Sequence, residues 1–197
     1  MTRVQPRSTV RRVLMAITVL CAACGGDDDG LTGPGDIAFE ANYTATVSGA
    51  VTQTIAGTAI FGTGTDPESG EQAWIVYLVT DPNSPLSAGS SVFFFGLGAP
   101  DIRSYTLEDF SQTGDVFPDG GVAAFVLVYD GQTLDGIFNS TGGSLTVSSL
   151  SETRMDGTFS FSATGTAFVG GTPADGSVTV QGSFEARGGS FLVPFGT

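Results

Sequence analysis

Apolar and polar residues alternate along most of the chain after residue 37, and this alternation constrains the fold more than any other feature. Successive side chains of a β-strand point to opposite faces, so a period of two predicts strands with one apolar face. Runs rich in Gly, Pro, Asp and Ser predict turns at 66–70, 81–85, 118–121, 130–131, 141–143 and 173–176,. About ten strands are expected, two within 37–61 and the others at 72–80, 91–97, 104–110, 122–129, 133–139, 144–150, 154–168 and 177–187.

Short turns between so many strands predict an all-β domain over residues 37–197. The expected architecture is an antiparallel β-sandwich, with an up-and-down β-barrel as the alternative. A chain of 197 residues is long enough to bury one substantial core of this kind,.

The strands in the middle of the chain differ from those near its end. Apolar and polar residues alternate in 154–168 and 177–187, which predicts one solvated face,. In 72–80 (QAWIVYLVT) and 91–97 (SVFFFGL), both alternating sets are apolar. Such strands have to be covered on both faces, by a second sheet and by a further layer. The candidates for that layer are the chain itself, for example the C-terminal segment 191–195 (FLVPF), a second subunit or a lipophilic ligand.

The N-terminus has the organisation of a signal peptide. Four arginines within residues 1–12 precede an apolar run, 13–20, that is too short to span a membrane,. Ala22, Ala23 and Cys24 then resemble a bacterial lipobox, in which the chain is cut before a cysteine that carries a diacylglyceryl group. Cys21 stands where such motifs commonly have Leu, and an ordinary secretory signal is the alternative. The resemblance implies a signal helix within a signal peptide at 1–23 and lipidation of Cys24.

A stretch rich in Gly and Asp, 24–36, connects this signal to the β domain. Its low apolar content predicts a flexible tether. In the sorting pattern of bacterial lipoproteins, an Asp directly after the lipidated cysteine retains a protein in the inner membrane, and this chain has Gly25 there. The expected location is therefore the cell envelope, with a lipid anchor in the outer membrane and the domain facing the periplasm or the cell surface.

The charged residues restrict both the partners and the chemistry. The chain has 20 Asp and Glu residues, seven Arg, and neither Lys nor His. Cleavage before Cys24 would leave three arginines and a net charge of −17, which repels nucleic acid,. Catalysis by a Ser-His-Asp or Cys-His system, a Schiff-base lysine or His-bound zinc is excluded, and no cofactor is expected. The expected partners are the membrane, through the N-terminal lipid, and an envelope protein or hydrophobic ligand.

Three segments near the C-terminus carry a family resemblance. These are 143–147 (GSLTV), 154–163 (RMDGTFSFSA) and 178–184 (VTVQGSF). They resemble a group of uncharacterised β-rich bacterial lipoproteins that have GTLTI, GTFSFTA and VTVTNGSF in this order. The resemblance covers roughly residues 140–187 and departs from the group at 165–176, which forms a longer insertion, and at Gln181-Gly182. It implies a β-sandwich lipoprotein and transfers no catalytic residue.

The aromatic strands suggest a binding site for an apolar molecule. If the domain is a barrel that carries a hydrophobic ligand, the lining residues would come from the two strands at 72–80 and 91–97. The candidates are Trp74, Tyr77, Phe93, Phe94 and Phe95. The carrier is the alternative to our main prediction, a non-catalytic binding or structural module of the envelope.

Acidic residues offer two further candidate sites. Asp66, Glu68 and Glu71 lie in one expected loop and are weak candidates for calcium ligands, since oxygen atoms alone suffice for this ion,. A hydrolase would require paired carboxyl groups, either Glu108 with Asp109 or Asp115 with Asp119,. Adjacent residues of a strand point to opposite faces, which disfavours the first pair. Most of these acidic residues are expected in solvated turns, where Asp and Glu are common. The hydrolase is therefore the weakest hypothesis, after the binding or structural module and the carrier.

Overall fold

A computed structural model describes residues 42–65, 70, 72–80, 89–110 and 121–188. These residues form nine β-strands and no helix. The strands are β1 (Tyr43–Gly49), β2 (Gln53–Thr65), β3 (Gln72–Val79), β4 (Ser91–Leu97), β5 (Ser104–Thr106), β6 (Val122–Asp130), β7 (Thr133–Ser151), β8 (Arg154–Val169) and β9 (Thr172–Gly188). The expected signal segment, tether and Cys24 lie outside the described residues. Within the described part of the chain, no helix is long and apolar enough to cross a membrane.

Eight of the strands form a closed ring. The hydrogen-bonded order is β7-β6-β4-β3-β2-β1-β9-β8, and β8 pairs again with β7. All of these pairings are antiparallel, apart from a short parallel contact between β2 and β9. β5 is attached to the second half of β7. The prediction of an all-β antiparallel fold is confirmed.

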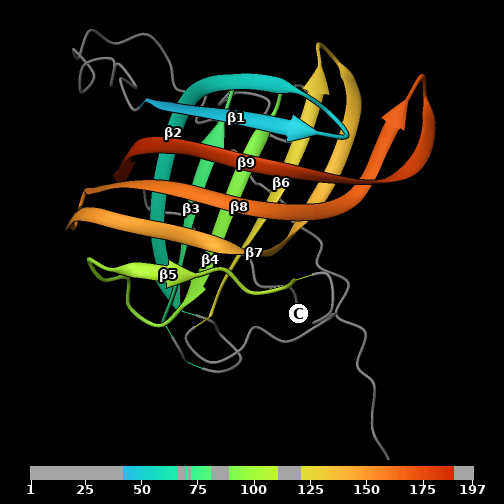
Figure 1. The fold of residues 1–197 in the computed structure, drawn as a ribbon. Helices are drawn as coiled ribbons and strands as arrows, with labels where there is room; N and C mark the ends of the chain where they lie inside the picture. The colour runs from blue at the N-terminus through green and yellow to red at the C-terminus, as the bar shows by residue number, and fades with distance from the viewer. Residues whose placement is uncertain (1–41, 66–69, 71, 81–88, 111–120, 189–197) are drawn as a thin grey trace, which may run out of the picture.

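The ring is flattened into two crossed layers (Figure 1). β1, β9, β8 and β5 run across the view in the nearer layer, whereas β3, β4 and β6 run steeply behind them. β2 belongs to both layers, because it pairs with β1 up to Gly57 and with β3 from Thr58 onward. A Cβ atom at position 57 would collide with the carbonyl oxygen of Val79, so glycine is required where β2 changes layer. The closed ring is a barrel, and its two crossed layers face each other like the sheets of a sandwich. Both predicted architectures therefore describe this fold.

Two of the predicted turns are wrong. The run 141–143 lies inside the continuous strand β7, where the register against β8 shifts between Ser140 and Gly142. Gly142 and Gly143 have positive φ angles because the strand is irregular here, and the chain does not reverse its direction at this point,. The run 173–176 lies inside β9, and the reversal occurs earlier, at Gly170 and Gly171. The expected insertion 165–176 is thus an extension of the β8–β9 hairpin.

Large apolar side chains fill the space between the two layers. Phe94 from the far layer lies against Phe159 and Phe161 of β8, with ring centroids 5.1 Å and 5.8 Å apart. Phe138, Leu78 and other fully buried residues continue this core. The side chains of 154–169 and 177–187 follow the expected alternation of buried and exposed residues, so these strands have one solvated face.

Candidate functional site

The far layer carries a second apolar cluster on its outer side. It consists of Ile60, Ile75, Tyr77, Val79, Phe93, Phe95, Phe125 and Leu127. We call this set the outer aromatic face. The cluster draws on β2, β3, β4 and β6, and it confirms the prediction that the middle strands are apolar on both faces.

Cross-strand register places the rings of this face in a row. Ile60 pairs with Tyr77, Tyr77 with Phe93, and Phe93 with Phe125. Tyr77 stacks on Phe93 with centroids 4.2 Å apart, and Phe93 stacks on Phe125 with centroids 4.1 Å apart. Such pairs contribute about 0.5–1.5 kcal/mol each beyond the area that they bury. The stacked rings therefore connect three adjacent strands of the far layer, β3, β4 and β6.

The five candidate ligand-lining residues are divided between two sides of the sheet. Trp74 and Phe94 point into the filled interior, whereas Tyr77, Phe93 and Phe95 belong to the outer aromatic face. The structure thus brings together three of the five, on an outer surface and not around an internal cavity. Phe125 and Ile60 complete this surface, and the lack of alternation in 122–129 (VAAFVLVY) is the sequence signal that pointed to β6.

Among the described residues, two tyrosines have buried hydroxyl groups without a hydrogen-bond partner. Tyr43 Oη belongs to the interior cluster and Tyr77 Oη to the outer aromatic face. Burial raises the pKa of both phenols above the usual range, because the charged phenolate would lose its hydration,. Both phenols stay neutral at physiological pH.

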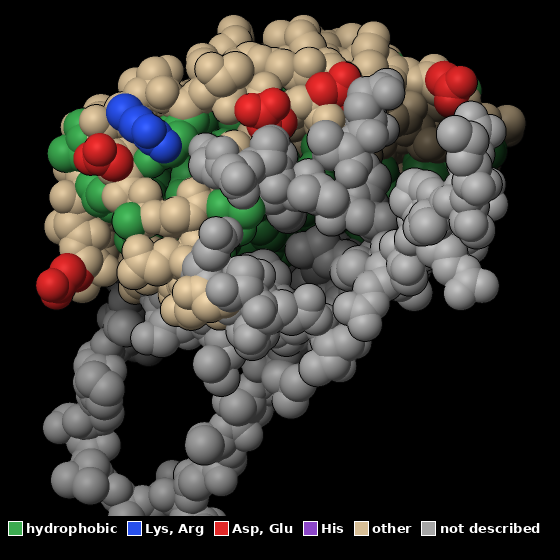
Figure 2. Space-filling model, turned by 90° about the horizontal axis from the view of Figure 1, so that it is seen from below, with side chains coloured by type: hydrophobic (Ala, Val, Ile, Leu, Met, Phe, Trp, Pro, Cys, Tyr) green, Lys and Arg blue, Asp and Glu red, His purple; other side chains and the backbone are tan. Residues whose placement is uncertain are grey.

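The near layer presents a different outer face, rich in hydroxyl groups. It is formed by Thr44, Thr46, Thr54, Thr158, Ser160, Ser162, Thr179, Gln181 and Ser183. We call this set the hydroxyl-rich face. In Figure 2 the layer nearest the viewer in Figure 1 forms the upper side, which is mostly tan with scattered red carboxylates. An open hollow of about 400 Å³ lies on this face, with Gly182, Ala45 and Phe159 among its lining residues.

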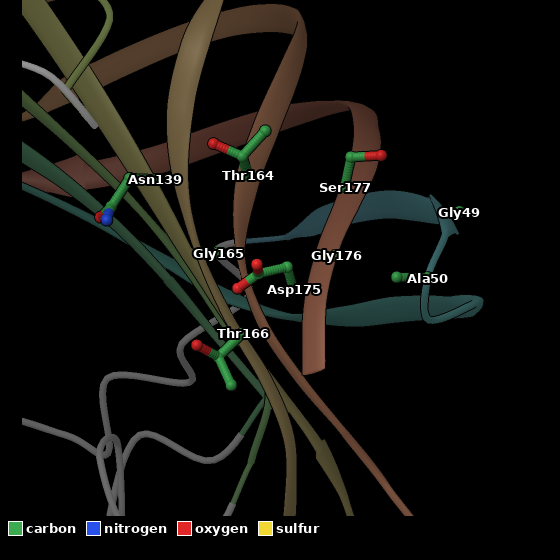
Figure 3. Close-up of a pocket in the computed structure, with 9 residues that line it drawn as sticks. All are labelled: Gly49, Ala50, Asn139, Thr164, Gly165, Thr166, Asp175, Gly176 and Ser177. Atoms are coloured by element: carbon green, nitrogen blue, oxygen red, sulfur yellow. The ribbon is translucent and has the colours of Figure 1, made fainter. Parts of the chain in front are cut away.

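A larger open hollow, of about 860 Å³, lies where the β8–β9 hairpin passes the turn after β1 (Figure 3). Most of its side chains are short and polar, and Asp175 is the one ionisable group among the described residues that line it. The residues that line it are Gly49, Ala50, Asn139, Thr164, Gly165, Thr166, Asp175, Gly176 and Ser177. The backbone N–H of Ala50 donates to the carbonyl oxygen of Ser177 at 2.9 Å, which ties the turn to the hairpin. The hollow suits hydrogen bonding better than apolar contact.

The acidic candidates are only partly within the described residues. Asp66, Glu68, Glu71, Asp115 and Asp119 lie outside them. The described part of the chain contains no group of three acidic, His or Cys residues that would hold a metal ion.

Glu108 occupies a structural position. Its backbone N–H donates to the carbonyl oxygen of Val122 at 2.8 Å, and its carbonyl oxygen accepts from Ser140 Oγ at 2.9 Å. These bonds fix the segment that follows β5 against β6 and β7.

Asp156 and Glu185 form the one described pair of carboxylates held by a common cation. They are register partners on β8 and β9. Arg154 Nε lies 2.7 Å from Asp156 Oδ1, and Arg154 Nη2 lies 3.0 Å from Glu185 Oε2. The hydrogen bond to Asp156 raises the pKa of Arg154. The charge of Arg154 partly neutralises the two carboxylates. A hydrolase, in contrast, needs two free carboxyl groups on either side of the glycosidic bond.

Comparison of the chain with models of protein families, with curated proteins and with solved structures gives no match.

Proposed function

We propose that the protein is a lipid-anchored protein of the bacterial cell envelope and that its β domain is a non-catalytic binding or structural module. The observation that carries the proposal is the sequence Ala22-Ala23-Cys24 after a basic and apolar N-terminus. The Gly- and Asp-rich residues that follow provide a spacer between this cysteine and β1, which begins at Tyr43. An acidic domain is not attracted to anionic headgroups, so attachment has to come from acyl chains.

The hydroxyl-rich face supports the binding part of the proposal. Its hydroxyl and amide groups both donate and accept hydrogen bonds, and they are presented on four neighbouring strands, β2, β1, β9 and β8,. A polar, uncharged partner is the one that fits such a face. The acidic groups at its border, including Glu185, disfavour anionic partners,.

Labelling with a palmitate analogue tests the anchor. The wild-type protein expressed in a Gram-negative host is expected to carry the label, and Cys24→Ala is expected to lose it. Cys21→Ala is the matched control, because this residue lies in the part that is removed. An unlabelled wild-type protein, or loss of label in Cys21→Ala alone, would refute the anchor.

Photo-crosslinking in intact cells tests the binding surface. A benzophenone amino acid at Gln181 samples the hydroxyl-rich face, and the same amino acid at the exposed Thr172, at the tip of the β8–β9 hairpin, is the control. A discrete adduct at 181 and not at 172 supports a partner at this face. The absence of any discrete adduct at 181 would contradict the binding module without affecting the anchor.

A further inference from the structure

The centre of the outer aromatic face is buried, whereas the residues around it, among them Phe95 and Phe125, are only partly buried. Phe93 and Tyr77 are 3% and 9% exposed. β3, β4 and β6 contact mainly their neighbouring strands within the sheet. Those neighbouring strands lie beside the outer aromatic face and not over it. The cover of this centre therefore has to come from a part of the protein outside these strands.

The last described residues of β9 end at the border of this face. Arg187 pairs with Ile60 and Gly188 with Phe61, in the parallel contact between β9 and β2. Ile60 belongs to the outer aromatic face and is the register partner of Tyr77. The chain beyond Gly188 thus begins one strand away from the row of stacked rings.

The neighbouring part of β2 leaves room for a crossing chain. Gly62 and Gly64 lie on the same side of β2 as Ile60, since side chains alternate along a strand,. They pair with Ile75 and Ala73 of β3. Neither glycine carries a side chain that would block a path from β9 onto the outer aromatic face.

The segment 189–197 (GSFLVPFGT) has the matching composition. It contains Phe191, Leu192, Val193 and Phe195 and no charged residue. Each of the other segments outside the described residues contains at least one carboxylate. Burying a carboxylate against an apolar face without a partner is costly, which favours the C-terminal segment as the cover.

The length of the segment is sufficient. Four adjacent strands, from β2 to β6, are about 15 Å wide at the usual strand spacing. Nine residues in an extended conformation reach about 30 Å. We propose that residues 189–197 fold back across β2 and that their apolar side chains occupy the outer aromatic face of the same molecule. This assignment is independent of the lipid anchor.

Photo-crosslinking of the purified full-length protein identifies the occupant. A benzophenone amino acid at Phe195 keeps the aromatic character of the site, and its adducts are located by mass spectrometry of tryptic and chymotryptic fragments. We expect intrachain links to β3, β4 or β6. Adducts of dimer mass would assign the face to a second copy and overturn the proposal, as would intrachain links confined to the near layer.

Dye binding provides an independent test. The double variant Phe191→Ser with Phe195→Ser is expected to bind an apolar dye such as anilinonaphthalene sulfonate several-fold more strongly, because the outer aromatic face would be uncovered. Its far-ultraviolet circular dichroism should remain that of the wild type. Ser190→Ala with Thr197→Ala is the matched control and should leave dye binding unchanged. Unchanged dye binding in the Phe double variant would overturn the proposal.

Discussion

The indole ring of Trp74 lies directly over Gly96, its register partner on the next strand. A Cβ atom at position 96 would collide with Cε2, Cζ2 and Nε1 of this ring. The indole also contacts Tyr105, with ring centroids 5.4 Å apart. The indole of Trp74 therefore fills the space that the missing side chain of Gly96 leaves.

We predict that Gly96→Ala destabilises the protein by about 1–3 kcal/mol, because the added methyl group forces the indole out of its position. Trp74 is the only tryptophan of the chain, so its fluorescence reports the displacement directly. Urea unfolding measures the loss of stability. In a Trp74→Phe background the same substitution should cost less, and equal costs in both backgrounds would contradict this contact as the cause.

We predict unequal effects for two neighbouring phenylalanines of β4. Phe94 is fully buried against rings of β8 and β9, so Phe94→Ala should cost about 3–5 kcal/mol,. Phe95 is half-buried on the outer aromatic face, and Phe95→Ala should cost distinctly less. Equal losses in urea unfolding would show that the two sides of the far layer are equally important for stability.

The sequence was sufficient to assign the faces of the strands. Alternation in 177–187 predicted which residues are buried in β9, and the doubly apolar strands predicted a layer that is apolar on both sides. It was not sufficient to locate every reversal of the chain. Gly142 and Gly170 both have positive φ angles, yet the first lies in a strand and the second in a turn. Long-range pairing of β7 with β8 decides between the two, and no local signal contains that information,.

The candidate ligand-lining residues show the same limitation. The spacing of Trp74, Tyr77 and the phenylalanines identified the aromatic strands correctly. Because side chains alternate along a strand, the sequence places Phe94 on the opposite face from Phe93 and Phe95. Only the register between strands shows that Phe125 extends the outer row of rings. The position of Gly188 beside Phe61, on which our inference about the C-terminal segment depends, is likewise a property of the closed ring.

We predict that Ser140→Ala costs about 1–3 kcal/mol. Ser140 Oγ accepts from the backbone N–H of Ala124 at 3.1 Å and donates to the carbonyl oxygen of Glu108 at 2.9 Å. Ser140 lies at the irregularity of β7. Its substitution would remove its hydrogen bonds to the N–H of Ala124 and to the carbonyl oxygen of Glu108. Ser160→Ala, at an exposed position of β8, is the control and should change stability by less than about 0.5 kcal/mol,. Similar unfolding midpoints for the two variants would contradict the role of Ser140.

Two tyrosine-to-phenylalanine substitutions should differ in their effect on stability at neutral pH. Tyr43 Oη is buried without a hydrogen-bond partner, so Tyr43→Phe removes an unsatisfied polar group and should leave stability unchanged or raise it,. Tyr105 Oη accepts from the backbone N–H of Asp101 at 2.6 Å and donates to the Asp101 carbonyl oxygen at 3.2 Å. Tyr105→Phe should therefore cost about 0.5–1.5 kcal/mol for each bond lost. A larger loss in Tyr43→Phe than in Tyr105→Phe would contradict the assignment.

The same burial predicts how stability changes in alkali. The pKa of Tyr43 is raised in the folded chain, whereas an unfolded tyrosine has a pKa of about 10,. Folding therefore favours the protonated phenol, and the stability that depends on this proton is fully present below about pH 10 and is lost as the pH rises further. Tyr43→Phe removes the titrating group, so its free energy of unfolding should fall less steeply above about pH 10 than that of the wild type. Urea unfolding at a series of pH values measures both slopes, and parallel slopes would show that the Tyr43 phenol ionises as readily in the folded chain as in the unfolded one.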